Sequence, residues 1–413
     1  MREPTAEDIE RDRPVLILTI SNGAGHVRVA QGIASAIKHL QPPMPVLIAD
    51  VGDYMNSVAR FTHVTAYLWL VKYAPAIWDR IDRYQKRQPQ TSPEWYYRQG
   101  CKNLFRVANR VRPRALVATE VGCCEIAALI KRDLALDAPL VAASDAPDVE
   151  RAWVQPEVDL YCFASDQNLE ELLQHGAPAE RVRTWGAPLA DGFDTPRERT
   201  VDRSAVCDWL ALDPQRPLLL VAGGGEGMGR IEEITSRLLR HGQPKLQIVV
   251  LTGRNERLRK RCARLPNPGD EKRLRVLTWA WPENMPKLMT AADLMISKLG
   301  SMFNEAVAAA LPIVALEPPP GSERLQYRLL EEWQVGRAVR TVDEVCATVT
   351  DLINHPEKLS AMREQSRARR KLDATRRIAC WLRDATSQGH SVSEGYRNMN
   401  TDYQTSLAQG VTC

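Results

Sequence analysis

A histidine at the start of an expected helix is the side chain best suited to act as a base. The apolar run from 14 to 20 predicts a buried parallel strand, and a glycine turn then leads to His26 at the start of a helix. A histidine near the positive end of a helix dipole tends to stay neutral and able to accept a proton. The alternative is a loop histidine that only hydrogen-bonds the backbone. Asp145 ends another expected strand and is a second candidate, because open α/β sheets bind ligands at the carboxyl ends of their strands.

A second strand–glycine–helix unit could hold a phosphate. The apolar residues 294–296 predict a strand, Gly300 breaks the pattern, a helix follows, and the run 313–316 predicts the next strand. The first N–H groups of such a helix, together with its dipole, favour an anion. Glu305 lies about one turn inside the helix, where its carboxylate could accept both hydroxyls of a ribose. These features suggest a nucleotide-sugar site, and the alternative is an ordinary α/β corner whose glycine only turns the chain.

The residues after the expected strand 217–221 are unusually rich in glycine. Five of the seven residues from 223 to 229 are glycines, so backbone must approach another group closely there or turn with positive φ. The run is not GxGxxG in any register, and the chain contains no GxxxxGK[ST]. The sequence therefore argues against a dinucleotide fingerprint and against a Walker P-loop. Arg254, which follows the next expected strand, could reach a diphosphate, although the basic helix after it could equally be a solvated surface.

An aromatic and basic segment lies between the first strands. From 72 to 114 the chain has eleven Lys or Arg against three Asp or Glu, and tryptophans and tyrosines are interleaved with them. This composition suits an anionic membrane surface, where the rings lie at headgroup level and the cations face the lipid. Nucleic acid uses the same residue types and is the weaker alternative. A plain helical hairpin with some aromatics packed inside is the third interpretation.

Length and composition exclude several classes of protein. The 413 residues, 44% of them apolar, predict two or three globular domains, and the net charge is +4. No run approaches the roughly 20 apolar residues of a membrane-spanning helix, and the charged N-terminus has no apolar core of a secretory signal. The nine scattered cysteines form no CxxC pair, which predicts reduced thiols in a cytosolic protein and no metal site.

The alternation of strands and helices predicts two doubly wound α/β halves. The expected divisions are a flexible N-terminus (1–12), an N-terminal domain (13–190), a linker (191–203), a C-terminal domain (204–355), a C-terminal helix (356–385) and a disordered tail (386–413).

These motifs together resemble a known family. The run 23–26 reads GAGH, the run 223–229 reads GGGEGMG and is followed by Glu232, and 253–255 reads GRN. The turn 298–300 with Glu305 and Ala306, then LPI at 311–313 and GSE at 321–323, complete the set. This pattern is similar to that of the two-domain glycosyltransferases that include monogalactosyldiacylglycerol synthase and bacterial processive diacylglycerol glucosyltransferase. The undecaprenyl-diphospho-muramoylpentapeptide N-acetylglucosaminyltransferase is a more distant member. The resemblance covers about residues 14–340, and its most specific part is the GGGEGMG run.

The resemblance implies a GT-B fold, with two doubly wound Rossmann-like domains facing a central cleft. It implies an inverting transfer of galactose or glucose from a UDP-sugar to diacylglycerol at the cytoplasmic face of an anionic membrane. It also implies that no cofactor or metal is needed, and it gives no role to nucleic acid. The sequence does not indicate an oligomeric state.

By the same resemblance, the implied roles fall on three groups of residues. The catalytic residues would be His26 and Asp145. The donor would be held by Gly25, Gly223, Gly224, Gly225, Glu226, Gly227, Met228, Arg254, Asn255, Lys298, Gly300, Ser301, Met302, Glu305, Ser322, Glu323 and Gln326. The acceptor or the membrane would be contacted by Trp69, Trp78, Trp95, Glu150 and Trp153.

Two alternatives stay open. One is transfer to another lipid-linked acceptor. The other is a non-catalytic homologue that binds lipid or nucleotide, because Gly300 and Glu305 are one residue closer than is usual in the family and Glu150 stands where the family has histidine.

Overall fold

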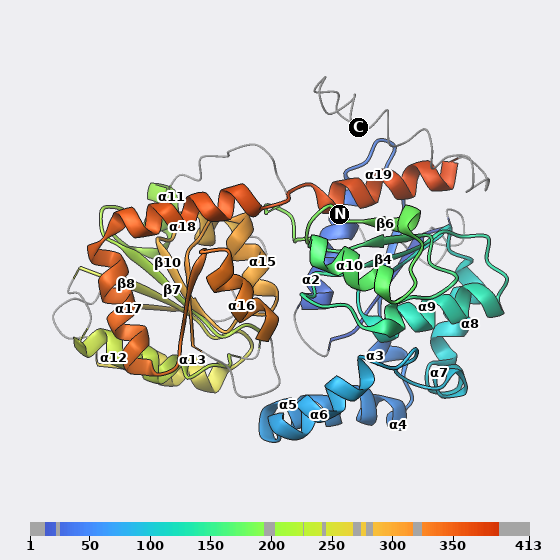
Figure 1. The fold of residues 1–413 in the computed structure, drawn as a ribbon, viewed down its shortest axis with the longest axis horizontal. Coiled ribbons are helices and arrows are strands. Elements are labelled where there is room, and N and C mark those ends of the chain that lie inside the picture. The colour runs from blue at the N-terminus through green and yellow to red at the C-terminus, as the bar shows by residue number, and fades with distance from the viewer. Residues whose placement is uncertain are drawn as a thin grey trace. The chain divides into compact units, whose positions relative to one another are not determined.

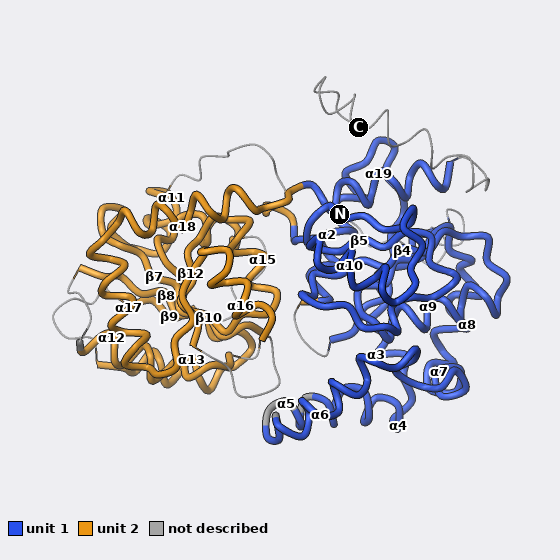
Figure 2. The backbone as a smooth tube through the Cα atoms, viewed as in Figure 1, with its two compact units in different colours: residues 1–22, 26–190, 373–413 blue, residues 23–25, 191–372 orange. Residues whose placement is uncertain are grey.

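The protein was analysed as a computed structural model, which describes residues 13–21, 25–193, 203–225, 227–241, 245–266, 274–277, 284–316 and 324–387. The chain forms two compact units (Figure 2): one contains residues 1–22, 26–190 and 373–413, and the other contains residues 23–25 and 191–372. The expected flexible N-terminus, most of the expected linker and nearly all of the expected tail lie outside the described residues.

Unit 1 is built on a six-stranded parallel sheet, sheet A, with strand order β2-β1-β3-β4-β5-β6. Its strands are β1 (Val15–Thr19), β2 (Val46–Asp50), β3 (Ala115–Ala118), β4 (Leu140–Ala143), β5 (Leu160–Cys162) and β6 (Val182–Arg183). Apolar residues run through the central strands because helices cover both faces of the sheet. The side chains of β1 alternate accordingly: Val15 and Ile17 belong to one core cluster, and Leu16 and Leu18 to another.

Helices of unit 1 cover both faces of sheet A. They are α2 (Gly25–Lys38), α3 (Val51–Tyr54), α4 (Ser57–Arg60), η1 (Phe61–Ala66), α5 (Tyr67–Tyr73), α6 (Pro75–Gln85), α7 (Glu94–Gly100), α8 (Lys102–Val111), α9 (Val121–Asp133), η2 (Arg151–Trp153), α10 (Asp166–Gln174), η3 (Ala179–Arg181) and α19 (Ala374–Ser387). Helices α2 and α19 pack on the Val15 face, and α8 and α9 pack on the Leu16 face. In Figure 1 the helices α4, α5 and α6 stand off from this sheet as an extension of the unit.

Unit 2 is built on a second six-stranded parallel sheet, sheet B, with strand order β12-β11-β10-β7-β8-β9. Its strands are β7 (Leu218–Ala222), β8 (Gln247–Leu251), β9 (Leu274–Leu277), β10 (Leu294–Ser297), β11 (Ile313–Leu316) and β12 (Gly336–Val339). Its helices are α11 (Arg203–Leu210), α12 (Ile231–His241), α13 (Glu256–Ala263), α14 (Met285–Ala291), α15 (Ser301–Ala308), α16 (Arg324–Glu332), α17 (Val342–Asn354) and α18 (Pro356–Arg369). The prediction of two doubly wound parallel sheets is confirmed.

The C-terminal helix differs from expectation. In place of one helix from 356 to 385 there are two, α18 in unit 2 and α19 in unit 1. The chain leaves helical geometry at Arg370, where ψ is 131°, and Asp373 has a φ of 76°. The apolar residues of α19, among them Ile378 and Leu382, are buried in the core of unit 1. The last helix among the described residues therefore completes the first unit.

Both sheets have a topological switch point, where successive connections leave toward opposite edges. In sheet A it lies between β1 and β3, and in sheet B it lies between β7 and β10. Open α/β sheets bind ligands outside the carboxyl ends of their strands at such points. The two strand–glycine–helix units singled out by the sequence begin at β1 and at β10, so both lie at switch points.

Candidate functional site

His26 lies at the switch point of sheet A, one residue into α2. Its Nδ1 is 3.0 Å from the backbone carbonyl of Thr119, which directly follows β3. Because a carbonyl only accepts hydrogen bonds, Nδ1 carries the hydrogen in the neutral ring and Nε2 keeps its lone pair. The hydrogen bond to backbone that the alternative expected is therefore present at Nδ1. This bond leaves Nε2 available to accept a proton.

Three acidic residues follow the strands around His26. Asp145 comes after β4 and is buried. Asp50 ends β2, where its carboxylate accepts hydrogen bonds from Gly52 N at 2.9 Å and from Ser21 N at 3.4 Å. Glu120 follows β3 and caps α9 by accepting from Cys123 N at 3.0 Å. Asp50 and Glu120 were missed by the sequence reasoning, although the rule that selected Asp145, an acid at the carboxyl end of a strand, applies to both.

Glu150 is surrounded by other carboxylates. Burial raises the pKa of Glu150 to about 8, and the neighbouring charges of Glu120, Asp82 and Asp148 raise it too, while Lys86 lowers it. Lys86 pairs with Asp148 at 2.5 Å and with Asp82 at 3.0 Å. At neutral pH the Glu150 carboxyl is therefore largely protonated and able to donate a hydrogen bond.

A buried carboxylate anchors the aromatic segment to the core of unit 1. Glu125 on α9 accepts hydrogen bonds from Thr91 N at 2.9 Å, from the Thr91 hydroxyl and from the Tyr97 hydroxyl at 3.0 Å. Tyr97 also stacks on His63, with ring centroids 5.8 Å apart. Burial raises the pKa of Glu125 to about 7, although these hydrogen bonds oppose the shift.

Glu125→Gln should stabilise the protein at alkaline pH. An acid whose pKa is raised by folding binds more protons folded than unfolded, so wild-type stability falls as pH rises from 4.5 to about 7. The glutamine amide can accept from Thr91 N and donate to the two hydroxyls, so the contacts are kept without the charge. We expect a gain of up to about 3 kcal/mol at pH 8.5 and little change at pH 4.5. Thermal unfolding at both pH values measures this, and an equal loss of stability at both would contradict it.

The glycine run after β7 is a tight turn packed against a second loop. Gly224, Gly227 and Gly229 have φ values of 65°, 63° and 95°. A Cβ at Gly253, which follows β8, would lie 2.3 Å from the carbonyl oxygen of Gly225. Both requirements inferred from the sequence, positive φ and close approach, are present here. The approach is of one loop backbone to another.

The turn after β10 meets this glycine run at the switch point of sheet B. The ends of β7 and β10 are paired, with Ser297 opposite Ala222. A Cβ at Gly229 would lie 3.7 Å from the Cβ of Lys298. Gly300 then caps α15, in which Met302 and Glu305 are buried and Ser301 is half-buried. The expected diphosphate and ribose residues on these two segments therefore lie together.

Other expected donor residues have structural contacts. The Asn255 side chain caps α13 by accepting from Leu258 N at 2.9 Å, and Arg254 N donates to Gly225 O at 2.8 Å. Gln326 hydrogen-bonds the backbone of Gly300. Gly225 and Met228 lie in the glycine turn, and Gly25 is the first residue of α2. Glu226, Ser322 and Glu323 lie outside the described residues.

The expected membrane and acceptor tryptophans divide into surface and core. Trp69 and Trp95 are 56% and 66% exposed, whereas Trp78 is half-buried against Tyr67. Trp153 is 3% exposed and packs edge-on against Phe163, with ring centroids 5.1 Å apart. Trp153 is therefore a core residue of unit 1 with too little exposed surface for a membrane contact, and its contact with the acceptor stays a prediction.

The sequence of each unit matches a known family. Residues 26–189 match the model of monogalactosyldiacylglycerol (MGDG) synthase, and residues 218–379 match the glycosyltransferase family 28 C-terminal domain. A processive diacylglycerol beta-glucosyltransferase of Staphylococcus epidermidis is 23% identical over 394 residues, which cover 93% of this chain and 95% of that protein.

Solved structures share the fold. Acinetobacter baumannii MurG covers 90% of this chain and 99% of its own with a TM-score of 0.57 at 14% identity. A UDP-GlcNAc 2-epimerase from Neisseria meningitidis, bound to UDP-GlcNAc, covers 90% and 100% with a TM-score of 0.58 at 13% identity. These likenesses confirm the predicted GT-B fold.

Proposed function

This chain belongs to the GT-B glycosyltransferases related to monogalactosyldiacylglycerol synthase, and from that premise we propose that it transfers galactose or glucose from a UDP-sugar to diacylglycerol. The observation that carries the proposal is that expected site residues lie at the switch point of each sheet, His26 in unit 1 and the turn before α15 in unit 2, and that each lies within a matched region. The name of the similar diacylglycerol beta-glucosyltransferase supports the acceptor. The UDP-GlcNAc bound to the similar epimerase supports a UDP-sugar as the donor.

Unit 2 holds the nucleotide in this proposal. The amides at the start of α15 and the glycine turn after β7 bind the diphosphate, since a helix N-terminus and positive-φ glycines offer backbone donors to an anion. Glu305 accepts the ribose hydroxyls. Arg254 adds positive charge where the departing UDP gains negative charge. The step needs no resident metal.

Unit 1 holds the acceptor and the base. Nε2 of His26 takes the proton from the acceptor hydroxyl as its oxygen bonds to the anomeric carbon of the sugar, and the bond from that carbon to the UDP oxygen breaks. The carbonyl of Thr119 holds the ring in the tautomer that carries its hydrogen on Nδ1. Attack from the face opposite the leaving group inverts the anomeric centre. Asp145 and the protonated Glu150 position the acceptor hydroxyls.

The segment of unit 1 from α4 to α7 supplies the membrane contact in this proposal. Phe61, Trp69, Tyr73 and Trp95 are at least 56% exposed, and Arg80 and Arg87 are exposed on the same segment. Within the described part of the chain, no helix combines the length and the apolar character needed to span a bilayer. In this proposal the exposed aromatic rings lie at headgroup level on the cytoplasmic face of the membrane.

Replacing Trp69 and Trp95 together by alanine should weaken binding to anionic vesicles. We expect a loss of about tenfold or more, because two interfacial rings leave the headgroup region. Co-sedimentation with phosphatidylglycerol vesicles measures it. Trp209→Ala is the matched control, because Trp209 is 50% exposed on α11 of unit 2. Equal binding by the double variant and the wild type would contradict a membrane contact through the segment from α4 to α7.

Transfer of radiolabel tests the function directly. Purified protein is incubated with UDP-galactose or UDP-glucose and diacylglycerol in anionic liposomes, and the lipids are separated by thin-layer chromatography. A labelled glycolipid from either donor supports the proposal. A second incubation offers polyprenyl phosphate as the acceptor, and label on that lipid alone would change the proposed acceptor. Binding of UDP without transfer to either lipid would favour a non-catalytic homologue.

A further inference from the structure

The side chain of Gln326 binds both backbone groups of a single residue, Gly300. Its Oε1 accepts a hydrogen bond from Gly300 N at 2.7 Å, and its Nε2 donates to Gly300 O at 3.1 Å. The side chain is 1% exposed. Gln326 is on α16 and follows Gly300 by 26 positions in the chain. A primary amide carries a donor and an acceptor side by side, so it can satisfy one residue's N–H and C=O together.

Gly300 needs such support because of its backbone conformation. Its φ of 72° and ψ of −150° fall in a region that is almost restricted to glycine. As the residue that caps α15, it provides no side-chain hydrogen bond to the helix. The direction of the first peptides of α15 therefore depends on how Gly300 is held.

We propose that Gln326 is a positioning residue for nucleotide binding: by clamping Gly300, it fixes the orientation of the amides that follow at Ser301 and Met302. The inference rests on the proposed function, in which these amides bind the UDP diphosphate. It also revises the role of Gly300, whose own N–H is engaged by Gln326. Gly300 contributes the turn, and the next residues contribute the donors.

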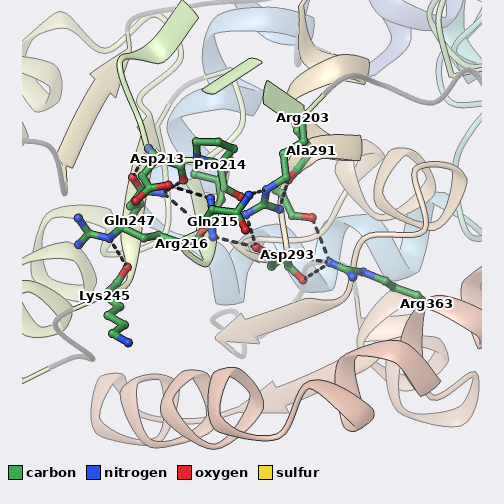
Figure 3. A network of polar contacts seen from close by, with 12 residues as sticks. Arg203, Asp213, Pro214, Gln215, Arg216, Lys245, Gln247, Ala291, Asp293 and Arg363 are labelled. Atoms are coloured by element: carbon green, nitrogen blue, oxygen red, sulfur yellow. Dashed lines mark hydrogen bonds and ion pairs between the residues drawn. The ribbon is translucent and has the colours of Figure 1, made fainter. Parts of the chain in front are cut away.

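Unit 2 contains a similar pair of hydrogen bonds at the amino-terminal ends of the strands of sheet B. Gln247, at the start of β8, accepts from Asp213 N at 2.8 Å and donates to Asp213 O at 2.8 Å (Figure 3). Gln247 is fully buried, as Gln326 nearly is. Strand β8 begins at Gln247, so this clamp lies at the amino edge of the sheet, away from the switch point. Removing it tests what the loss of a buried amide clamp does to stability alone.

Gln326→Leu and Gln247→Leu form the matched pair of variants. UDP affinity is measured by calorimetry at a temperature at which both variants are folded by circular dichroism. Hydrogen exchange of the peptide 298–305 reports the turn directly. We expect Gln326→Leu to raise the Kd for UDP by about tenfold or more and to speed exchange in this peptide. Gly300 then loses the partner of its N–H and keeps only the hydrogen bond from Phe303 N to its carbonyl, so the turn is held less firmly. Gln247→Leu should lower the melting temperature with neither effect.

The outcomes separate this inference from the function it rests on. A Kd for Gln326→Leu within about twofold of the wild type would overturn the clamp, and so would equal weakening by both variants. Wild-type protein that binds no UDP would overturn the proposed function. In that case the exchange of 298–305 still decides whether Gln326 orders the turn: unchanged exchange in Gln326→Leu refutes it.

Discussion

Replacing His26 by alanine should abolish hexose transfer and leave UDP binding intact. His26 lies in unit 1 and is proposed to act only on the acceptor hydroxyl, whereas the nucleotide contacts come from unit 2. Loss of a general base typically costs about 10²- to 10⁴-fold in rate. Initial rates of glycolipid formation, together with the Kd for UDP by calorimetry, separate the two effects. The loss should appear in kcat, with little change in the KM for the donor.

His39→Ala is the matched control for this variant. His39 follows the other end of α2, and its Nδ1 bonds the backbone carbonyl of Ser35 at 2.9 Å, as that of His26 bonds Thr119. The ring is exposed and belongs to no expected site. Its removal should leave the rate unchanged. Near wild-type turnover in His26→Ala would assign the base to another group, with Asp145 the next residue to change.

Local sequence patterns predicted the parts of the fold that short-range rules govern. The apolar run before His26 and the run 294–296 became the strands β1 and β10, because helices bury both faces of a parallel sheet. Gly300 was expected to turn the chain, and it does so with positive φ. Asp145 was found because an acid directly follows an apolar strand.

The side-chain contacts that the sequence could not predict are those made by residues far apart in the chain. Gln326 was assigned to the donor by the resemblance to a family, and its hydrogen bond with Gly300, 26 positions away, could not be read from the local sequence. Trp153 was assigned to the acceptor or the membrane only by the resemblance to a family, and the packing that buries its ring against Phe163 in the core of unit 1 cannot be read from the local sequence. The N-cap of α13 by Asn255 could have been predicted, because asparagine directly before a helix is a common N-cap residue.

Replacing Asp293 by alanine should destabilise unit 2 more than any surface change. Its carboxylate accepts hydrogen bonds from Arg203 at 2.9 Å, from Leu218 N at 2.9 Å and from Arg363 at 3.0 Å (Figure 3). It therefore joins α11, the first residue of β7 and α18 to the start of β10. Arg203 also donates to the carbonyls of Ala291, Pro214 and Arg216, so it cannot leave the site without breaking them.

The alanine variant leaves two arginines and one backbone N–H without this acceptor. We expect a loss of about 2–4 kcal/mol in the free energy of unfolding, measured in urea. Asp351→Ala is the control: Asp351 also has two side-chain partners, Lys358 at 2.7 Å and His355 at 3.0 Å, but they are exposed. Ion pairs in water add little to stability, so this control should unfold close to the wild type. Equal losses in the two variants would mean that burial does not matter at Asp293.

The pH dependence of this loss identifies its cause. Burial opposes ionisation of Asp293, but the hydrogen bonds from Arg203, Leu218 and Arg363 hold its pKa below the ordinary 3.8. A carboxyl whose pKa is lowered by folding stabilises the protein above its unfolded pKa, and this contribution is lost as pH falls through its folded pKa. The difference between wild type and Asp293→Ala should therefore be full at pH 7 and shrink below about pH 4. A difference that stays constant down to pH 2 would show that lost packing, and not the lost charge, destabilises the variant.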